Sequence, residues 1–174
     1  MTMTMTGDIG DNDTPSATSV TDNGFLNGRL QILQPRKGYR AGLDAVMVAA
    51  AVPACPGETV LEAGIGTGVA TLCLMTRIPD LHVVGSEINP ESARLARDNA
   101  SRNGFADTLQ VMQGDVTMPA GQRETYGLSA GSFDHAFANP PYRDPARMRT
   151  GNNDARNVAH LVSPDSLLDW IRFM

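Results

Sequence analysis

Residues 58–78 read ETVLEAGIGTGVATLCLMTRI, and this stretch decides the fold. Its beginning, 58–64, is a short apolar run of the kind that forms a buried β-strand. Glycine then occupies three alternate positions: Gly64, Gly66 and Gly68. The end of the stretch, 69–78, predicts a helix that stops before a proline. A strand that turns through glycines into a helix is the first half of a βαβ unit, and it predicts a parallel sheet.

The alternation of strands and helices continues on both sides of this stretch. Further strands are predicted at 81–87, 108–115 and 132–139, and further helices at 43–52 and 90–104. Short apolar alternation broken by Gly and Pro at 24–39 predicts a hairpin or a small strand pair. With the strands of the parallel sheet numbered in chain order, we expect them to lie in the order 3-2-1-4. The fold class is therefore α/β, with a mostly parallel, twisted sheet flanked by helices.

Composition indicates one globular domain. The chain has 174 residues, of which 41% are hydrophobic and 19% charged, enough for a sizeable core. Residues 1–24 are polar, so we expect a disordered tail before a domain at 25–174. No apolar run approaches the roughly 20 residues that cross a bilayer, and the first residues do not resemble a secretory signal. Cys55 and Cys73 are too far apart for a CxxC pair, so a cytoplasmic location without disulfides is expected, with Cys73 a buried thiol.

Charge is unevenly distributed along the chain. The formal net charge is −5, but residues 1–24 carry four aspartates and no basic residue, so the remainder is nearly neutral. Basic residues cluster before the first predicted helix and after residue 142: Arg29, Arg36, Lys37 and Arg40, then Arg143, Arg147, Arg149 and Arg156. These clusters are either solvated surface charge or phosphate contacts, so overall acidity does not exclude RNA or DNA.

The glycine turn favours a cationic cofactor. Its spacing is G-x-G-x-G, whereas a dinucleotide fingerprint is G-x-G-x-x-G and places a pyrophosphate on the helix N-terminus. Glu62, two residues before the first glycine, would repel a pyrophosphate and attract a cation. S-adenosylmethionine carries both an ammonium and a sulfonium group, and we predict that it binds here. The alternative is a tight turn without a ligand.

Acidic residues end the next two strands as well. Glu87, about twenty residues past the glycine turn, is predicted to accept hydrogen bonds from the ribose hydroxyls, with Ile88 beside it. Asp115 is predicted to accept from the adenine amine, with Val116 packed against the ring. The alternatives are a surface acid beside the next helix for Glu87 and a turn aspartate for Asp115. Parallel sheets bind ligands at these carboxyl ends.

The last predicted strand ends in ANPPY, residues 138–142, where two prolines cannot continue a sheet. These residues and the glycine turn resemble the Rossmann-like methyltransferases that use S-adenosylmethionine, in which NPPY marks transfer to a planar, conjugated nitrogen. The side-chain oxygen of Asn139 and the carbonyl of Pro140 would accept the amine hydrogens and localise the lone pair toward the methyl group. Asn139 also counts as a cofactor contact.

The resemblance also implies substrate contacts. Tyr142 would stack on the planar substrate, and we place Pro141 and three arginines beside it: Arg143, Arg147 and Arg156. No metal is expected, because His82, His135 and His160 share no ligand spacing.

A narrower resemblance covers about residues 25–173. The stretches GRLQILQPRKGYRAGLDAVMVAAAVP, FANPPY and DARNVAHL are similar to the bacterial tRNA(Val) adenine-N6 methyltransferase family. That resemblance makes Tyr39, Arg40, Gly42 and Asp44 candidates for contact with cofactor or substrate. Asp44 is alternatively a helix cap. The family continues with a fifth strand and a closing hairpin, so we expect the last strands to be missing, and an open sheet edge that a homodimer could cover.

Three functions stay open at this point. The first is methyl transfer to an exocyclic amine of adenine in RNA, with tRNA favoured. The second is transfer by the same fold to a release-factor glutamine amide, to guanine N2 of rRNA or to adenine in DNA. The third is a catalytically silent module that keeps the cofactor as a ligand.

Overall fold

The computed structural model describes residues 20–140 and 164–174. Its centre is a parallel sheet of four strands in the order β5-β4-β3-β6. The strands are β3 (Thr59–Ala63), β4 (His82–Glu87), β5 (Leu109–Gln113) and β6 (His135–Ala138). With these four strands numbered 1 to 4 in chain order, this is the predicted order 3-2-1-4, and β6 lies at one edge. The predicted α/β class is confirmed.

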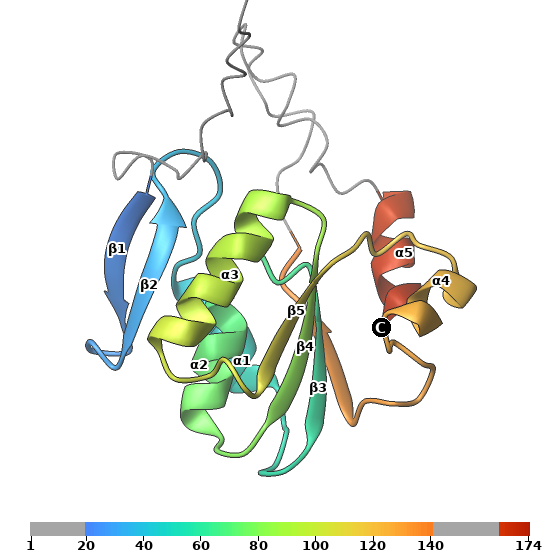
Figure 1. The fold of residues 1–174 in the computed structure, drawn as a ribbon, viewed down its shortest axis with the longest axis horizontal. Helices are drawn as coiled ribbons and strands as arrows, with labels where there is room; N and C mark the ends of the chain where they lie inside the picture. The colour runs from blue at the N-terminus through green and yellow to red at the C-terminus, as the bar shows by residue number, and fades with distance from the viewer. Residues whose placement is uncertain (1–19, 141–163) are drawn as a thin grey trace, which may run out of the picture.

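Helices cover both faces of the sheet (Figure 1). On one side lie α1 (Leu43–Ala51), α2 (Val69–Arg77) and α3 (Pro90–Arg102). On the other side lie α4 (Ala120–Thr125) and α5 (Pro164–Phe173). Side chains alternate across β3: Val60 packs into the core under α2, and Leu61 and Ala63 pack into the core that includes Phe173 of α5. Cys73 is buried in the first of these cores, as the helical pattern predicts.

An antiparallel hairpin forms a separate small sheet beside the helices (Figure 1). It consists of β1 (Val20–Phe25) and β2 (Leu30–Pro35). The buried Leu30 and Ile32 of β2 join the same core as α1 and α2. A hairpin is therefore present as predicted, but it spans residues 20–35 rather than 24–39. It packs on the helices rather than on the main sheet.

The prediction of a disordered tail over 1–24 is wrong for its last residues. Val20–Phe25 form β1. This strand lacks an apolar pattern of its own, and side-chain hydrogen bonds from another part of the chain hold its polar residues. The guanidinium of Arg40 donates to Thr21 Oγ1 at 2.7 Å and to Asn23 Oδ1 at 2.7 Å. Residues 1–19 lie outside the described part of the chain.

Two asparagines fasten β2 to α3. The N–H of Leu33 donates to Asn99 Oδ1 at 2.7 Å, and Asn99 Nδ2 donates back to the Leu33 carbonyl at 3.0 Å. Asn103, one turn later, repeats this exchange with Gln31 at 2.9 Å in both directions. Asn99 is fully buried and also donates to the carbonyl of Thr67 at 2.9 Å, so one side chain joins the hairpin to the glycine turn.

Candidate functional site

The register of the sheet brings the predicted residues to one edge. Ala63 of β3 pairs with Ala138 of β6, so Gly64 and Asn139, the next residues, leave neighbouring strands side by side. Glu87 of β4 pairs with Gln113 of β5, which places Asp115 two residues beyond the same edge. The four carboxyl ends therefore meet where a parallel sheet binds ligands.

The glycine turn has a backbone that only glycine adopts without strain. Gly64, Gly66 and Gly68 have φ of 68°, 57° and 86°, in the left-handed region. The N–H of Ile65 donates to the Ser86 carbonyl at 2.9 Å, and the N–H of Gly68 closes the turn on Ile65 at 2.9 Å. The turn is thus tied to β4, and its main chain carries no side chain of its own at three positions.

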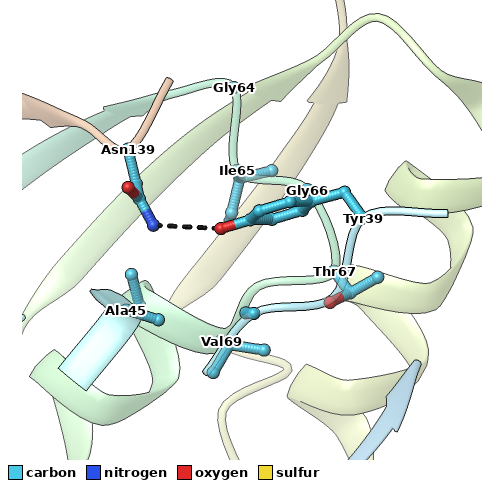
Figure 2. A pocket seen from close by; sticks show the side chains of 10 residues that line it. Tyr39, Ala45, Gly64, Ile65, Gly66, Thr67, Val69 and Asn139 are labelled. Carbon is cyan, nitrogen blue, oxygen red and sulfur yellow. Dashed lines mark hydrogen bonds between the residues drawn. The ribbon is translucent and has the colours of Figure 1, made fainter. Parts of the chain in front are cut away.

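Two cavities lie at the carboxyl ends of the strands, one of them against this turn. The smaller, about 30 Å³, lies between the turn, Tyr39 and Asn139 (Figure 2). The larger, about 400 Å³, lies beyond the ends of β4 and β5, where Ile88 and Asp115 line it. Its volume is in the range of small-molecule sites.

Glu87 contacts or adjoins residues that line each cavity. One carboxylate oxygen accepts from the N–H of Gly66 at 2.8 Å, and the other accepts from the N–H of Asn89 at 2.8 Å. Gly66 lines the smaller cavity and Ile88 the larger. The nearly buried carboxylate therefore joins the glycine turn to the start of α3, and each oxygen keeps a further lone pair.

Glu62 differs from its predicted charge state. Its side chain is buried, and Thr71 Oγ1 of α2 donates to it. Burial raises its pKa from 4.5 to about 8, against the hydrogen bonds from Thr71 and with a small contribution from the charge of Glu87. The sequence prediction assumed a carboxylate, whereas the side chain is mainly neutral at pH 7 because desolvation disfavours its charge.

Asn139, Tyr39 and Asp44 form a closed set of hydrogen bonds. Asn139 Nδ2 donates to Asp44 Oδ2 at 2.9 Å and to the Tyr39 hydroxyl at 3.3 Å. The Tyr39 hydroxyl donates to the same Asp44 oxygen at 2.6 Å. The amide oxygen of Asn139 is buried and has no partner among the described residues. Figure 2 shows the amide nitrogen pointing to Tyr39.

Other predicted residues have structural contacts. Arg40 donates to the Pro35 carbonyl at 2.7 Å besides its two bonds to β1, so its guanidinium holds the hairpin. Gly42 precedes α1, and its N–H donates to Asp44 Oδ1 at 2.9 Å. Asp115 accepts from the N–H of Thr117 at 2.8 Å, as in a turn, and lines the larger cavity. Val116 packs against the core that includes α5.

Several predicted residues lie outside the described part of the chain. They are Pro141, Tyr142, Arg143, Arg147 and Arg156. Within residues 20–140 and 164–174, no three His, Cys, Asp or Glu side chains gather to hold a metal ion. No helix in these ranges is long and apolar enough to cross a membrane.

Sequence reasoning missed two features of the site. Gln122 and Tyr126 line the larger cavity from α4 and the residue after it, because this short helix has no buried residue and so no apolar period to detect. The bonds of Asp44 and Tyr39 to Asn139 were also missed. The partners are 95 and 100 residues apart, and a single sequence carries no signal for that contact.

Known proteins resemble this chain over most of its length. Residues 60–158, more than half of the chain, match the family described as methyltransferase domain. The tRNA1(Val) (adenine(37)-N6)-methyltransferase of Histophilus somni is 29% identical over 84% of this chain and 59% of that protein. The release factor glutamine methyltransferase of Moorella thermoacetica is 29% identical over 82% of this chain and 48% of that protein. The chain thus spans about half to three fifths of these relatives.

A solved structure shows the same architecture. The predicted O-methyltransferase Atu636 from Agrobacterium tumefaciens superposes with a TM-score of 0.56 at 26% identity, over 75% of this chain and 53% of that one. S-adenosylmethionine is the cofactor of this fold. The described residues fit it, because Gly66 of the glycine turn faces open space and a cavity of about 400 Å³ lies along the same sheet edge. By its family match, strand order and fold, this chain belongs to the S-adenosylmethionine-dependent methyltransferases.

Proposed function

We propose that this chain transfers a methyl group to the exocyclic amine of adenine in RNA, with tRNA as the substrate. One observation carries the proposal: Asn139, at the edge of the glycine turn, has a buried amide oxygen without a partner among residues 20–140 and 164–174. A buried acceptor of this kind calls for an N–H donor. An exocyclic amine supplies such a donor, and the relatives named as tRNA adenine methyltransferases support the choice of base.

The residues at this site can compensate for the weak nucleophilicity of the adenine amine. The lone pair of an adenine amine is delocalised into the ring, which makes it a weak nucleophile. Asn139 Oδ1 and the Pro140 carbonyl accept the two amine hydrogens and draw the nitrogen toward tetrahedral geometry. When bound, S-adenosylmethionine would supply an electrophilic methyl group and leave as S-adenosylhomocysteine. The amine nitrogen would gain the methyl group and release its surplus proton to solvent.

The remaining contacts of the cofactor follow the sheet edge. We assign the ribose hydroxyls to Glu87, whose oxygens each keep a lone pair, and the adenine to Ile88, Asp115 and Val116. The turn from Gly64 to Gly68 receives the amino-acid end, with Glu62 beneath it as a neutral group. By resemblance alone, we also keep Arg40 and Gly42 as residues that contact the amino-acid end of the cofactor.

The substrate side of the proposal rests on residues outside the described ranges. Tyr142 stacks on the flipped base next to Pro141. The basic side chains of Arg143, Arg147 and Arg156 contact phosphates of the RNA.

A glutamine amide is the second candidate substrate. Its nitrogen is also planar and conjugated, so the same two acceptors would serve it, and one relative is a release factor glutamine methyltransferase. A silent cofactor-binding module is the third possibility.

One experiment separates these functions. S-adenosylhomocysteine is expected to raise the melting temperature, and labelled S-adenosylmethionine is offered with separate pools of tRNA, rRNA, DNA and release factor. Label in adenine of tRNA supports the proposal; label only in release factor replaces it with the second candidate; binding without transfer to any pool supports the silent module. Asn139→Ala is expected to lower kcat roughly a hundredfold or more while leaving a measurable residual rate. Gln110→Ala, the same loss of an amide at an exposed position of β5, is the control.

The edge strand β6 suggests an assembly. We propose that two chains meet at its outer edge, which pairs with no other described strand. Light scattering at high concentration is expected to give a dimer, and a monomer throughout would contradict this.

A further inference from the structure

We propose that Asp44 is a positioning residue for the methyl transfer. It holds the side-chain amide of Asn139 in one orientation, with Oδ1 turned to the amine that accepts the methyl group. This inference rests on the proposed function, because it assigns a role to the same amide. It adds a residue from α1 that acts through Asn139 rather than on the substrate.

The two oxygens of Asp44 have different partners. Oδ1 accepts from the N–H of Gly42 at 2.9 Å, which fixes the carboxylate against the start of α1. Oδ2 accepts from the Tyr39 hydroxyl at 2.6 Å and from Asn139 Nδ2 at 2.9 Å. Asp44 is not the N-cap residue, which is Gly42, but its carboxylate accepts a backbone N–H at the start of α1 besides its contacts to Tyr39 and Asn139.

These contacts permit only one orientation of the amide. A carboxylate has no hydrogen to donate, so a reversed amide would place the Asn139 oxygen against the negative Asp44 oxygen. The Tyr39 hydroxyl already gives its hydrogen to Asp44, so toward Asn139 it can only accept. A reversed amide would also turn its NH₂ group to a substrate that is itself an N–H donor.

The charge of Asp44 also strengthens the acceptor. Donation from Nδ2 to a carboxylate polarises the amide and places more negative charge on Oδ1, as in other chains of hydrogen bonds. Partial burial acts to raise the pKa of Asp44. The hydrogen bonds from Tyr39, Asn139, Gly42 and Ala45 outweigh it and lower the pKa from 3.8 to about 2. At that pKa Asp44 is a poor proton acceptor, which leaves orientation and polarisation as its role.

Kinetics of single and double variants test the role. Asp44→Ala is expected to lower kcat at least tenfold with the Kd for S-adenosylhomocysteine within twofold of wild type. Asp44→Asn, which can still turn an oxygen to Asn139, is expected to fall between. In an Asn139→Ala background, Asp44→Ala is expected to change kcat no further, whereas a structural role would lower stability and activity in both backgrounds. Asp98→Asn, a half-exposed aspartate of α3 that pairs with Arg94 of the same helix, is the control.

A spectroscopic measurement tests the geometry without turnover. The side-chain amide protons of Asn139 are expected to exchange slowly with solvent, and faster in Asp44→Ala. The Asp44 carboxyl is expected to titrate at a higher pKa in Asn139→Ala than in the wild type. Unchanged amide exchange and carboxyl titration overturn the inference in an active or inactive chain alike. If the wild-type chain transfers methyl groups and Asp44→Ala leaves kcat unchanged, the inference is overturned and the proposed function stands. If the wild-type chain transfers no methyl group but Asp44→Ala still speeds amide exchange, the orienting role stands and the proposed function is overturned.

Discussion

The indole ring of Trp170 lies against the backbone of Gly64, so close that a Cβ built on the glycine would stand 2.3 Å from the ring carbon Cη2. Trp170 belongs to α5, and Gly64 begins the glycine turn. The helix that follows the NPPY segment therefore reaches back to the turn. Gly64 is required there for two reasons, its left-handed φ of 68° and the space that the ring occupies.

Alanine substitutions separate these two reasons. Gly66→Ala meets no atom within 4 Å, so it is expected to cost only the backbone strain, about 1–2 kcal/mol of unfolding free energy. Gly64→Ala must also displace the Trp170 ring and is expected to cost at least about 1 kcal/mol more. Urea unfolding of both variants measures the difference. Equal losses would mean that the ring moves aside freely.

The fluorescence of Trp170 is expected to report cofactor binding. It is the one tryptophan of the sequence and touches the turn that we assign to the cofactor. Titration with S-adenosylhomocysteine is expected to change its emission, with a midpoint equal to the calorimetric Kd. Heat of binding without a change in emission would place the ligand away from Gly64. Trp170→Phe, which keeps an aromatic ring, removes the signal and serves as the optical control.

Glu62 is expected to make the fold less stable as the pH rises. Its folded pKa, about 8, is above its ordinary value of 4.5, so the stability it contributes is complete below pH 4.5 and is lost as the pH rises to 8. Each unit of pKa difference corresponds to about 1.4 kcal/mol. Glu62→Gln keeps a neutral acceptor for Thr71. Its unfolding free energy is expected to change less with pH over this window than that of the wild type. Glu124→Gln, at an exposed position of α4, is expected to follow the wild type; a wild-type curve parallel to that of Glu62→Gln would mean that Glu62 is charged in the fold.

Asn99 is expected to be the stronger of the two fasteners of the hairpin. Asn99→Ala leaves the N–H and carbonyl of Leu33 and the carbonyl of Thr67 without this partner in the interior, for a cost of about 2–4 kcal/mol. Asn103→Ala, at a more exposed position, is the matched comparison and is expected to cost about 1 kcal/mol. Hydrogen exchange at the Leu33 amide and urea unfolding measure both. A larger loss at Asn103 would contradict the burial argument.

The order of the elements could be predicted because it depends on local patterns. Apolar runs, the glycine turn and the prolines place β3, α2, β4 and α3 to within a few residues, and parallel connections then fix the strand order. The ends of these strands also bring Gly64, Glu87 and Asn139 together, since carboxyl ends share one edge. The family match and the solved relative bear out the methyltransferase fold; the roles of the individual residues stay predictions.

Other features depend on contacts that no local pattern records. The polar residues of β1 look disordered until Arg40 is seen to hold Thr21 and Asn23. Glu62 looks charged until its burial against α2 is known. The link from Asp44 to Asn139 joins a helix to a strand end far along the chain. In each case, tertiary packing decides what the side chain does.

Asn99 makes the hairpin and the glycine turn thermodynamically dependent on each other. The same amide group that holds the backbone at Leu33 also holds it at Thr67. A ligand that orders the turn would therefore slow the opening of a hairpin more than thirty residues earlier in the chain. By reciprocity, a macromolecule that grips the hairpin would tighten the turn around a small ligand by the same free energy.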